Sequence, residues 1–435
     1  MAKKLFAIVF ILNYIIMGLG RYYTLPLPVS VTMELSFILL IVVMAADKKI
    51  LKSDWSRLSN PCLFIYAVWL AYCTFQIVNS TCNNADIGAW FKDYRNVAIL
   101  MLYPMIIMPV MFKDKKGMKF FIFLWGVMTL LATAKGYYQK NRGFDPYEMT
   151  WLLTYGRRTH FIITGIRYFS FFTDAANYGC NMAATMVSFG ILAFSTKKLK
   201  EKLFYLLVMV GAGYSMLISG TRSAILVAGF GIAMYMFLSK NFKMFTISGF
   251  AFLVIICGLK FTNVGDGNRM IHRMRTAFDP NDPSKAVRDM NRAKIAKYMS
   301  DAPIGIGLGR DVTNVPVNNK YYVVAITPPD STQVYIWVHT GIIGLWLYMG
   351  VMIALVLAGG YVILFKIRDK ELRQMLSAFL TGFACMIIAG YGNQVTTQYP
   401  NNLIFFGAVA LVFSGVIVDK EISERKAEET KQIEE

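Results

Sequence analysis

Four short polar segments interrupt an otherwise apolar chain, and they carry the side chains that could do chemistry. They are centred on Arg167, on Arg222, on the pair Arg288 and Arg292, and on Asp330. A guanidinium group can grip a phosphate through two parallel hydrogen bonds, whereas lysine acts as a point charge. A carboxylate can take a proton from a hydroxyl group. The segments therefore predict a site for an anionic substrate, with a proton acceptor beside it.

The spacing of the arginines indicates how two of these segments fold. Arg222 lies in the motif Ser-Gly-Thr-Arg-Ser between two apolar runs, where glycine allows a tight turn at the membrane boundary. Arg288 and Arg292 are four residues apart, which places both on one face of an amphipathic helix. Two alternatives stay open. Arg222 could extend to lipid headgroups, and the helix could present its arginines to solvent.

Aromatic and polar side chains mix in the segment that precedes an apolar run at residue 179. Arg167, Asp174 and Asn177 stand there among several aromatic residues. An aromatic platform beside polar donors suits a sugar, whose faces are apolar and whose rim carries hydroxyl groups. An aromatic belt at the membrane interface would explain the same residues.

The Pro-Pro-Asp-Ser motif that ends in Ser331 leads into another apolar run. The two prolines stop a helix and favour an extended approach. Asp330 and Ser331 then stand where a helix begins, and either residue is a good N-cap. The functional alternative is that Asp330, at the end of a membrane helix and near several arginines, serves as a general base.

The elements that must position these residues are membrane helices. Hydrophobic residues make up 56% of the chain and charged residues only 16%, which is too apolar for a soluble domain. Runs long enough to cross a bilayer recur throughout, and we predict an all-α polytopic bundle of about twelve spans. The expected spans are roughly 5–20, 28–46, 61–78, 96–112, 119–134, 179–195, 203–218, 223–239, 244–260, 332–365, 375–391 and 401–418.

Lysine clusters on alternate connections predict the orientation. They lie at residues 3–4, 48–57, 113–119, 197–202, 240–243 and 366–373. By the positive-inside rule these connections and both termini face the cytoplasm, and the first span acts as a signal anchor. Residues 1–418 then form a single membrane domain, and residues 419–435 form a charged cytoplasmic tail that is predicted to be a frayed helix.

Two long loops remain on the outer side, at about 135–178 and 261–331, and they are rich in arginine. They contain Arg142, Arg157, Arg158, Arg167, Arg269, Arg273, Arg275, Arg288, Arg292 and Arg310. Topology explains the lysines in the net charge of +19, and an anionic substrate would explain the arginines. Ion pairs with loop acids and lipid headgroups are the alternative.

Other chemistries find little support in the sequence. The six cysteines and three histidines are scattered, so neither a disulfide framework nor a metal site is predicted. No nucleotide-binding motif is present, which argues against an ATP-driven pump. We expect no cofactor, no metal and no nucleic-acid partner.

From about residue 160 to 365 the chain resembles the O-antigen ligase and O-antigen polymerase family of bacterial envelope proteins. The Ser-Gly-Thr-Arg-Ser element resembles the family's Ser-Arg-Gly-type turn and carries over Arg222. Pro303 and the following glycines resemble its Pro-x-x-Gly-x-Gly-x-Gly element, one residue short. Arg288, with Arg292 as second choice, stands at the spacing of a family loop arginine. Arg167 and Asn177 resemble the Arg and Asn before the sixth span.

The chain departs from the ligase pattern where the loop ends. That pattern is His-Asn-x-x-Leu followed by Glu-Thr-Gly-Ile-Ile-Gly. Aligned on residues 340–344, the His position holds Asp330, the Asn position holds Ser331, and the Glu position holds His339. Because the ligase histidine is absent, the comparison favours a polymerase over a ligase.

The resemblance implies glycosyl transfer from a polyprenyl-diphosphate-linked oligosaccharide to a sugar hydroxyl, without a metal, on the periplasmic face of the inner membrane. Arg222, Arg288 and Arg292 would neutralise the leaving diphosphate, and Asp330 would be the base. The expected substrate-binding residues are Arg167, Asn177, Arg269, Arg273, Arg275, Ser331 and His339. The alternatives are a ligase that transfers the glycan to lipid A core or protein, a polysaccharide flippase, and a non-enzymatic partner of other envelope assembly proteins.

Overall fold

Long apolar helices dominate the computed structural model, which describes residues 1–23, 27–82, 86–162, 165–239, 242–265, 267–276 and 283–434. Within these residues, ten helical segments are long and apolar enough to cross a membrane. They contain α1 (Ala2–Tyr22), α2 (Val29–Ala46), α4 (Pro61–Phe75), α5 (Ile87–Tyr94) continued by α6 (Leu100–Met111), α7 (Lys115–Arg142), α10 (Ala175–Ser195), α11 (Leu199–Ile218), α17 (Thr332–Tyr361), α18 (Lys370–Gly392) and α19 (Asn401–Glu434).

Two further apolar helices complete the match to the predicted spans. They are α12 (Ser223–Ser239), which is shorter, and α13 (Phe242–Phe261). Each predicted span coincides with one of the helices now named, so the predicted all-α polytopic class is confirmed. Runs of apolar residues locate such helices well because a helix in lipid must satisfy its own backbone hydrogen bonds.

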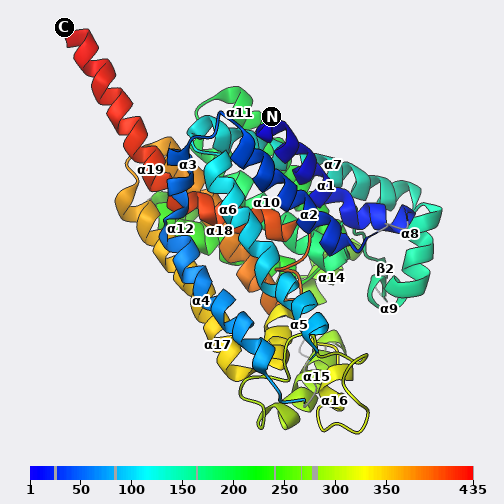
Figure 1. The fold of residues 1–435 in the computed structure, drawn as a ribbon. Helices are drawn as coiled ribbons and strands as arrows, with labels where there is room; N and C mark the ends of the chain where they lie inside the picture. The colour runs from blue at the N-terminus through cyan, green and yellow to red at the C-terminus, as the bar shows by residue number, and fades with distance from the viewer. Residues whose placement is uncertain are drawn as a thin grey trace.

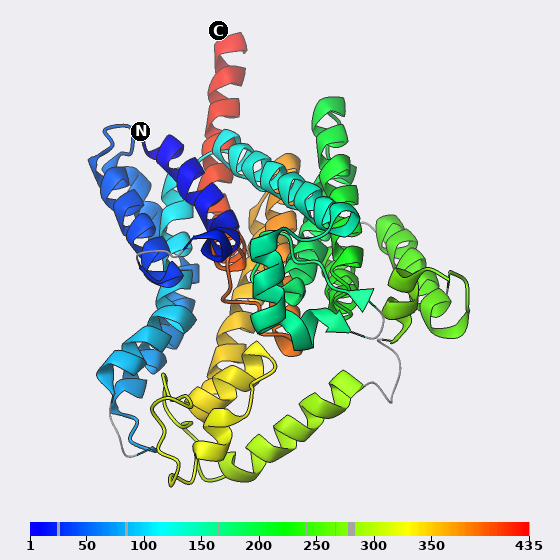
Figure 2. The ribbon, with the colours of Figure 1, turned by 90° about the vertical axis from the view of Figure 1, so that its right-hand side faces the viewer.

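The connections hold short elements. They are α3 (Lys52–Trp55), α8 (Pro146–Trp151), α9 (Arg157–His160), the antiparallel strands β1 (Phe161–Ile162) and β2 (Gly165–Ile166), α14 (Arg269–Arg275), α15 (Pro283–Met299) and α16 (Tyr322–Ile326). Both chain termini lie at one end of the molecule, and α15 and α16 lie at the opposite end, called the loop end below (Figures 1 and 2). The predicted loop 261–331 therefore contains helices of its own.

The centre of the bundle is formed by α10, α18 and α19. In these helices 78%, 78% and 89% of the most apolar window is buried, against 22% in the peripheral helix α2. Small residues allow the close packing. A Cβ at Gly382 of α18, for example, would lie only 2.7 Å from the Ser188 hydroxyl of α10, which itself donates to the Ala378 carbonyl at 3.0 Å.

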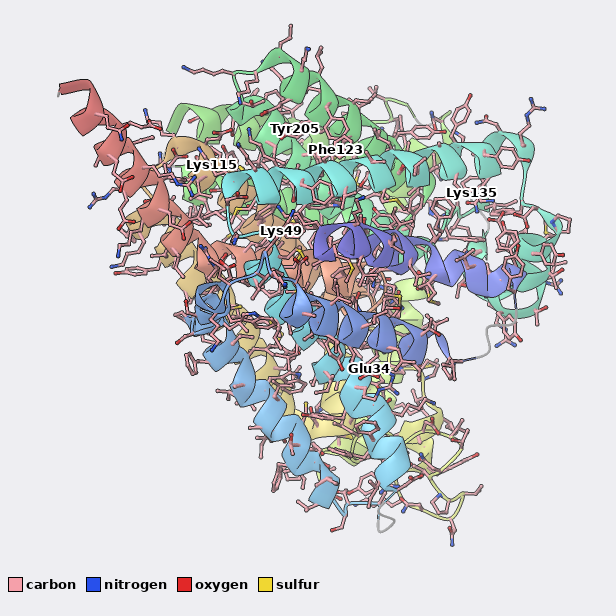
Figure 3. The ribbon with its side chains drawn as sticks, turned by 45° about the horizontal axis from the view of Figure 1, so that its top comes forward. Glu34, Lys49, Lys115, Phe123, Lys135 and Tyr205 are labelled. Atoms are coloured by element: carbon pink, nitrogen blue, oxygen red, sulfur yellow. The ribbon has the colours of Figure 1, made fainter. Side chains whose placement is uncertain are left out.

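Several of the predicted lysine-rich connections meet at the end of the bundle that carries the termini. Lys115, at the start of α7, pairs with Asp369 at 3.1 Å before α18. Lys119, one turn on, pairs with Glu201 of α11 at 2.9 Å. Lys113 pairs with Asp54 of α3 at 2.8 Å. Lys115 stands near one end of α7, and Lys135 stands towards the other (Figure 3). The lysines thus gather at one end, as their alternation predicts.

The last helix continues beyond the predicted span. Figure 1 shows α19 as one helix whose C-terminal part projects from the bundle. Asp419, where the predicted tail begins, is a buried carboxylate that accepts hydrogen bonds from the backbone N–H groups of Arg368 and Asp369 at 3.1 and 2.8 Å. Contacts with the bundle continue beyond it, because Glu421 pairs with Arg57. The described part of the predicted frayed tail is a regular helix.

Candidate active site at the loop end

The glycine-rich segment at Pro303–Gly309 docks onto a break in helix α17. Gly341 has φ +73° inside α17, a conformation that suits glycine, and a Cβ there would overlap the Pro303 carbonyl. At the break, backbone N–H and carbonyl groups of α17 are free of helical hydrogen bonds, and the glycine-rich segment forms hydrogen bonds with them. The N–H of Gly307 donates to the carbonyl of His339 at 3.1 Å, and that of Ile343 donates to Pro303 at 3.2 Å. The glycines of this motif allow the backbone of the segment to lie directly against the backbone of α17, because a Cβ at Gly305 would overlap it.

His339 is part of the same docking. Its side chain is 6% exposed, its Nδ1 lies 3.1 Å from the Gly307 carbonyl oxygen, and its ring packs on Tyr335 with 4.3 Å between ring centroids. The ring is enclosed between helix α17 and the glycine-rich segment, and the contact of His339 with substrate stays a prediction.

A carboxylate that sequence reasoning missed holds the other side of this segment. Asp93 of α5 accepts from the Gly309 N–H at 2.9 Å and from the Tyr335 hydroxyl at 2.5 Å. Asn79 adds hydrogen bonds to the carbonyls of Ile304 and Gly305 at 3.0 and 3.2 Å. These contacts fix the loop-end half of α17 against α5 and so set the position of the residues that precede the helix.

The sequence left open whether Asp330 or Ser331 caps helix α17, and the structure gives the two residues different contacts. Ser331 is the N-cap of α17, because its hydroxyl accepts from the Val334 N–H at 3.2 Å, and the residue is 1% exposed. The structure gives Ser331 a capping role, and its substrate contact stays a prediction. The half-buried Asp330 instead turns its carboxylate to α15, where it accepts from the Asn291 amide at 2.8 Å.

Three arginines from separate segments converge at the turn before α12. Gly220, with φ +59°, leaves room for the guanidinium of Arg273, whose Cζ would lie 2.7 Å from a Cβ there. Arg273 is 9% exposed, and its Nε has no hydrogen-bond partner among the described residues. Burial, and then the charges of Arg167 and Arg222, lower the pKa of Arg273 to about 9.

Arg167 is held more fully than Arg273. It donates to the Thr221 hydroxyl at 2.9 Å and to the Thr159 carbonyl at 3.1 Å. Burial lowers the pKa of Arg167, Asp174 opposes this effect, and Arg222 and Arg288 add to it. We call Arg167, Arg222, Arg273 and Arg288 the arginine cluster, because their charges act on one another at the same place.

The two arginines of α15 face the end of α18. Arg288 donates through Nη2 to the Asn393 side-chain oxygen at 3.3 Å. Arg292 donates to the Tyr391 carbonyl at 3.4 Å and covers the Tyr391 ring at 5.1 Å. The predicted common face exists and packs on protein, so the alternative of a simple solvated face does not describe it.

Arg222, a member of the cluster, and Arg275 contact the segments on either side of α14. Arg222 itself reaches Thr276 after α14, with its Nη1 3.4 Å from both the carbonyl and the hydroxyl oxygen. Arg275 donates to the Val264 carbonyl. The side chain of Arg269 lies outside the described residues.

Asn177 is fully buried in the packing of α10, and its contact with substrate stays a prediction. Its amide donates to the Tyr399 carbonyl at 2.8 Å and accepts from Asn401 at 2.7 Å. Both ends of the amide are thus occupied, and contact with a substrate would break these hydrogen bonds. Asn177 joins α10 to the start of α19.

Comparison with known proteins bears on this site. Residues 204–349 match the family model described as O-antigen ligase. The matched segment contains Arg222, Arg273, Arg288, Arg292 and Asp330, so most of the described site lies within it. No curated protein matches the chain.

The apolar helices and this match define a multi-pass bacterial membrane protein with a role in glycan transfer. The resemblance seen in the sequence is confirmed for residues 204–349, which match the O-antigen ligase model. The matched segment lies within the wider region, residues 160–365, that the motifs had indicated.

Proposed function

We propose that the protein is a polymerase that transfers an oligosaccharide from a polyprenyl diphosphate to a sugar hydroxyl. The observation that carries this proposal is the guanidinium of Arg273, which is buried beside two other arginines and whose Nε has no partner among the described residues. Among the described residues no carboxylate acts on the pKa of Arg273, and a buried charge that is not compensated costs roughly several kcal/mol. We therefore expect this guanidinium to bind an anion.

The diphosphate of the donor fits this cluster. Its oxygens can accept paired hydrogen bonds from guanidinium groups. The carboxylate that opposes the cluster's charge, Asp174, is engaged as the N-cap of α10, where it accepts from Ala176 and Asn177 N–H groups at 2.7 and 2.9 Å. Positive charge therefore dominates, and it would stabilise the negative charge that develops as the diphosphate leaves.

Asp330 would receive the proton. The acceptor hydroxyl oxygen forms a bond to the anomeric carbon of the donor sugar as the bond from that carbon to the diphosphate oxygen breaks. The hydroxyl proton passes to the Asp330 carboxylate, and the diphosphate remains on the arginines. Asn291, three residues after Arg288 in α15, hydrogen-bonds Asp330 at 2.8 Å, so one helix supports both the base and a phosphate ligand.

We place the loop end in the periplasm, with both termini in the cytoplasm and the bundle in the bacterial inner membrane. The gathering of lysines Lys113, Lys115 and Lys119 at the end with the termini supports this orientation. Asp330, in the place of the ligase histidine, supports the polymerase assignment over transfer to lipid A core.

The test is transfer by the full-length protein in detergent, given radiolabelled lipid-linked repeat units from its own host. Chains of increasing length are expected. A single transfer to added core lipid would instead identify a ligase, and recovery of unchanged repeat units would overturn the proposal. Arg222→Lys keeps the positive charge but cannot form the two parallel hydrogen bonds of a guanidinium group. We therefore expect it to lower turnover by about tenfold or more.

A further inference from the structure

Asn393 lies where three parts of the site meet. It follows α18 directly and is 8% exposed. Its side-chain oxygen accepts from Arg288 at 3.3 Å, and its side-chain nitrogen donates to the Ser223 hydroxyl at 2.6 Å. Its backbone oxygen accepts from the N–H and the hydroxyl of Thr332 at 3.4 and 3.3 Å.

Each of these partners adjoins a residue of the site. Ser223 follows Arg222 at the start of α12, and Thr332 is two residues after Asp330 at the start of α17. Arg288 is itself a member of the arginine cluster. One residue of a fourth segment therefore connects α12, α15 and α17, which the chain brings together from widely separated positions.

The chemistry of an amide explains this placement. An asparagine side chain offers an acceptor and two donors, so it can accept a hydrogen bond from a guanidinium on one side and donate one to a hydroxyl on the other. Because the amide is neutral, it orients Arg288 without neutralising it. A carboxylate at the same position would form an ion pair with Arg288 and would compete with a phosphate for that charge.

We propose that Asn393 is a positioning residue, which holds Arg288 in the geometry that binds the diphosphate and fixes its separation from Arg222 and Asp330. This inference rests on the proposed function. It assigns Asn393 no contact with substrate and no proton transfer.

The probe for the test is geranylgeranyl diphosphate, titrated into the full-length protein in detergent. Removing the amide in Asn393→Ala should weaken binding roughly threefold to tenfold, because one hydrogen bond that orients Arg288 is lost. Asn393→Asp should weaken binding by about tenfold or more, because its carboxylate pairs with the guanidinium. Asn401→Ala is the matched control, since Asn401 is buried nearby but bonds to Asn177 and Val395.

A double-mutant cycle separates positioning from simple support of the fold. If Asn393 acts through Arg288, Asn393→Ala should change the affinity by less than about twofold in an Arg288→Gln background. Asn401→Ala should lower the midpoint of thermal unfolding while the folded protein keeps its affinity. Additive effects of Asn393→Ala and Arg288→Gln would overturn the inference. Absence of binding to the wild-type protein would instead count against the proposed function.

Discussion

Asn291 and Asp330 are joined by a hydrogen bond of 2.8 Å from the amide to the carboxylate, and this contact ties the middle of α15 to the approach to α17. The neighbouring Ser331 caps α17, so Asp330 is not needed to begin the helix. The two adjacent residues can therefore be tested separately.

Asp330→Asn should leave the midpoint of thermal unfolding nearly unchanged, because the cap is elsewhere, and should lower polymer formation by about 100-fold or more. Ser331→Ala should do the opposite: it should cost about 1 kcal/mol of stability and leave the folded protein active. Polymer length and membrane abundance, measured for both variants, decide this. A normally expressed and fully active Asp330→Asn protein would remove Asp330 from the mechanism.

Replacing Arg273 by methionine should make the ligand-free protein more stable and less able to bind its donor. The substitution removes a buried charge whose neighbours are arginines, and we expect a gain of about 1–4 kcal/mol. Thermal unfolding in detergent and titration with geranylgeranyl diphosphate measure the two effects. Arg292→Met is the control for the stability measurement, because Arg292 contacts Tyr391 and is less buried than Arg273. A less stable Arg273→Met protein would contradict the view that this charge awaits an anion.

Gly341→Ala should prevent accumulation of folded protein. The positive φ and the adjoining Pro303 carbonyl leave no place for a Cβ. Gly350, in the same helix, has open space around the position of a Cβ. Gly350→Ala should therefore be tolerated, with a stability change within about 1 kcal/mol in the favourable direction. Membrane abundance of the two variants is the measurement, and equal abundance would show that the docking of the glycine-rich segment tolerates a side chain.

Acidification should lower the stability of the folded protein through His160, which connects α9 to the start of α10. His160 is buried, its Nε2 accepts from the Ala175 N–H at 3.2 Å, and burial lowers its pKa from 6.5 to about 4. The folded state thus prefers neutral His160, and the unfolded state binds a proton below pH 6.5. Stability should be complete above pH 6.5 and should fall as the pH drops towards 4, by about 2 kcal/mol at pH 5. In His160→Gln this part of the pH dependence should vanish; an unchanged profile would exclude His160 as its source.

The orientation can be read with an impermeant thiol reagent on intact cells whose outer membrane has been permeabilised. Val317→Cys, at a side chain that is 77% exposed at the loop end, should react. Lys198→Cys, in the connection before α11, should react only after the inner membrane is opened. Because five of the six native cysteines are buried, the background should be low, and Cys257→Ser removes the remaining one. The reverse pattern would place the site in the cytoplasm.

The sequence was sufficient for features that depend on local pattern. The spans follow from apolar length, and the common face of Arg288 and Arg292 follows from their spacing of four residues. It could not decide between Asp330 and Ser331 as the cap, because both residue types cap helices well. That choice depends on α15, which supplies Asn291 to one of them.

Other features depend on contacts between distant segments. Nothing in the local sequence of Arg273 indicates that its guanidinium lies over Gly220, more than fifty residues away. Asn393 was missed for the same reason, although the polar run 393–402 between two buried helices was a usable signal. Polar residues that interrupt apolar spans are costly to bury unless they are hydrogen-bonded, and here they bond to one another and to the site.

The break at Gly341 divides α17 into two mechanical parts. The half that begins at Thr332 is bonded to the glycine-rich segment and to Asp93, whereas the half beyond Gly341 continues among the apolar helices. Lipid-exposed helices adjust their tilt to the thickness of the bilayer. If α17 were one unbroken helix, each change in its tilt would also displace Asp330, which directly precedes it. We expect the docking of Pro303 at Gly341 to keep the Asp330 carboxylate beside α15 when the membrane half of α17 changes its tilt.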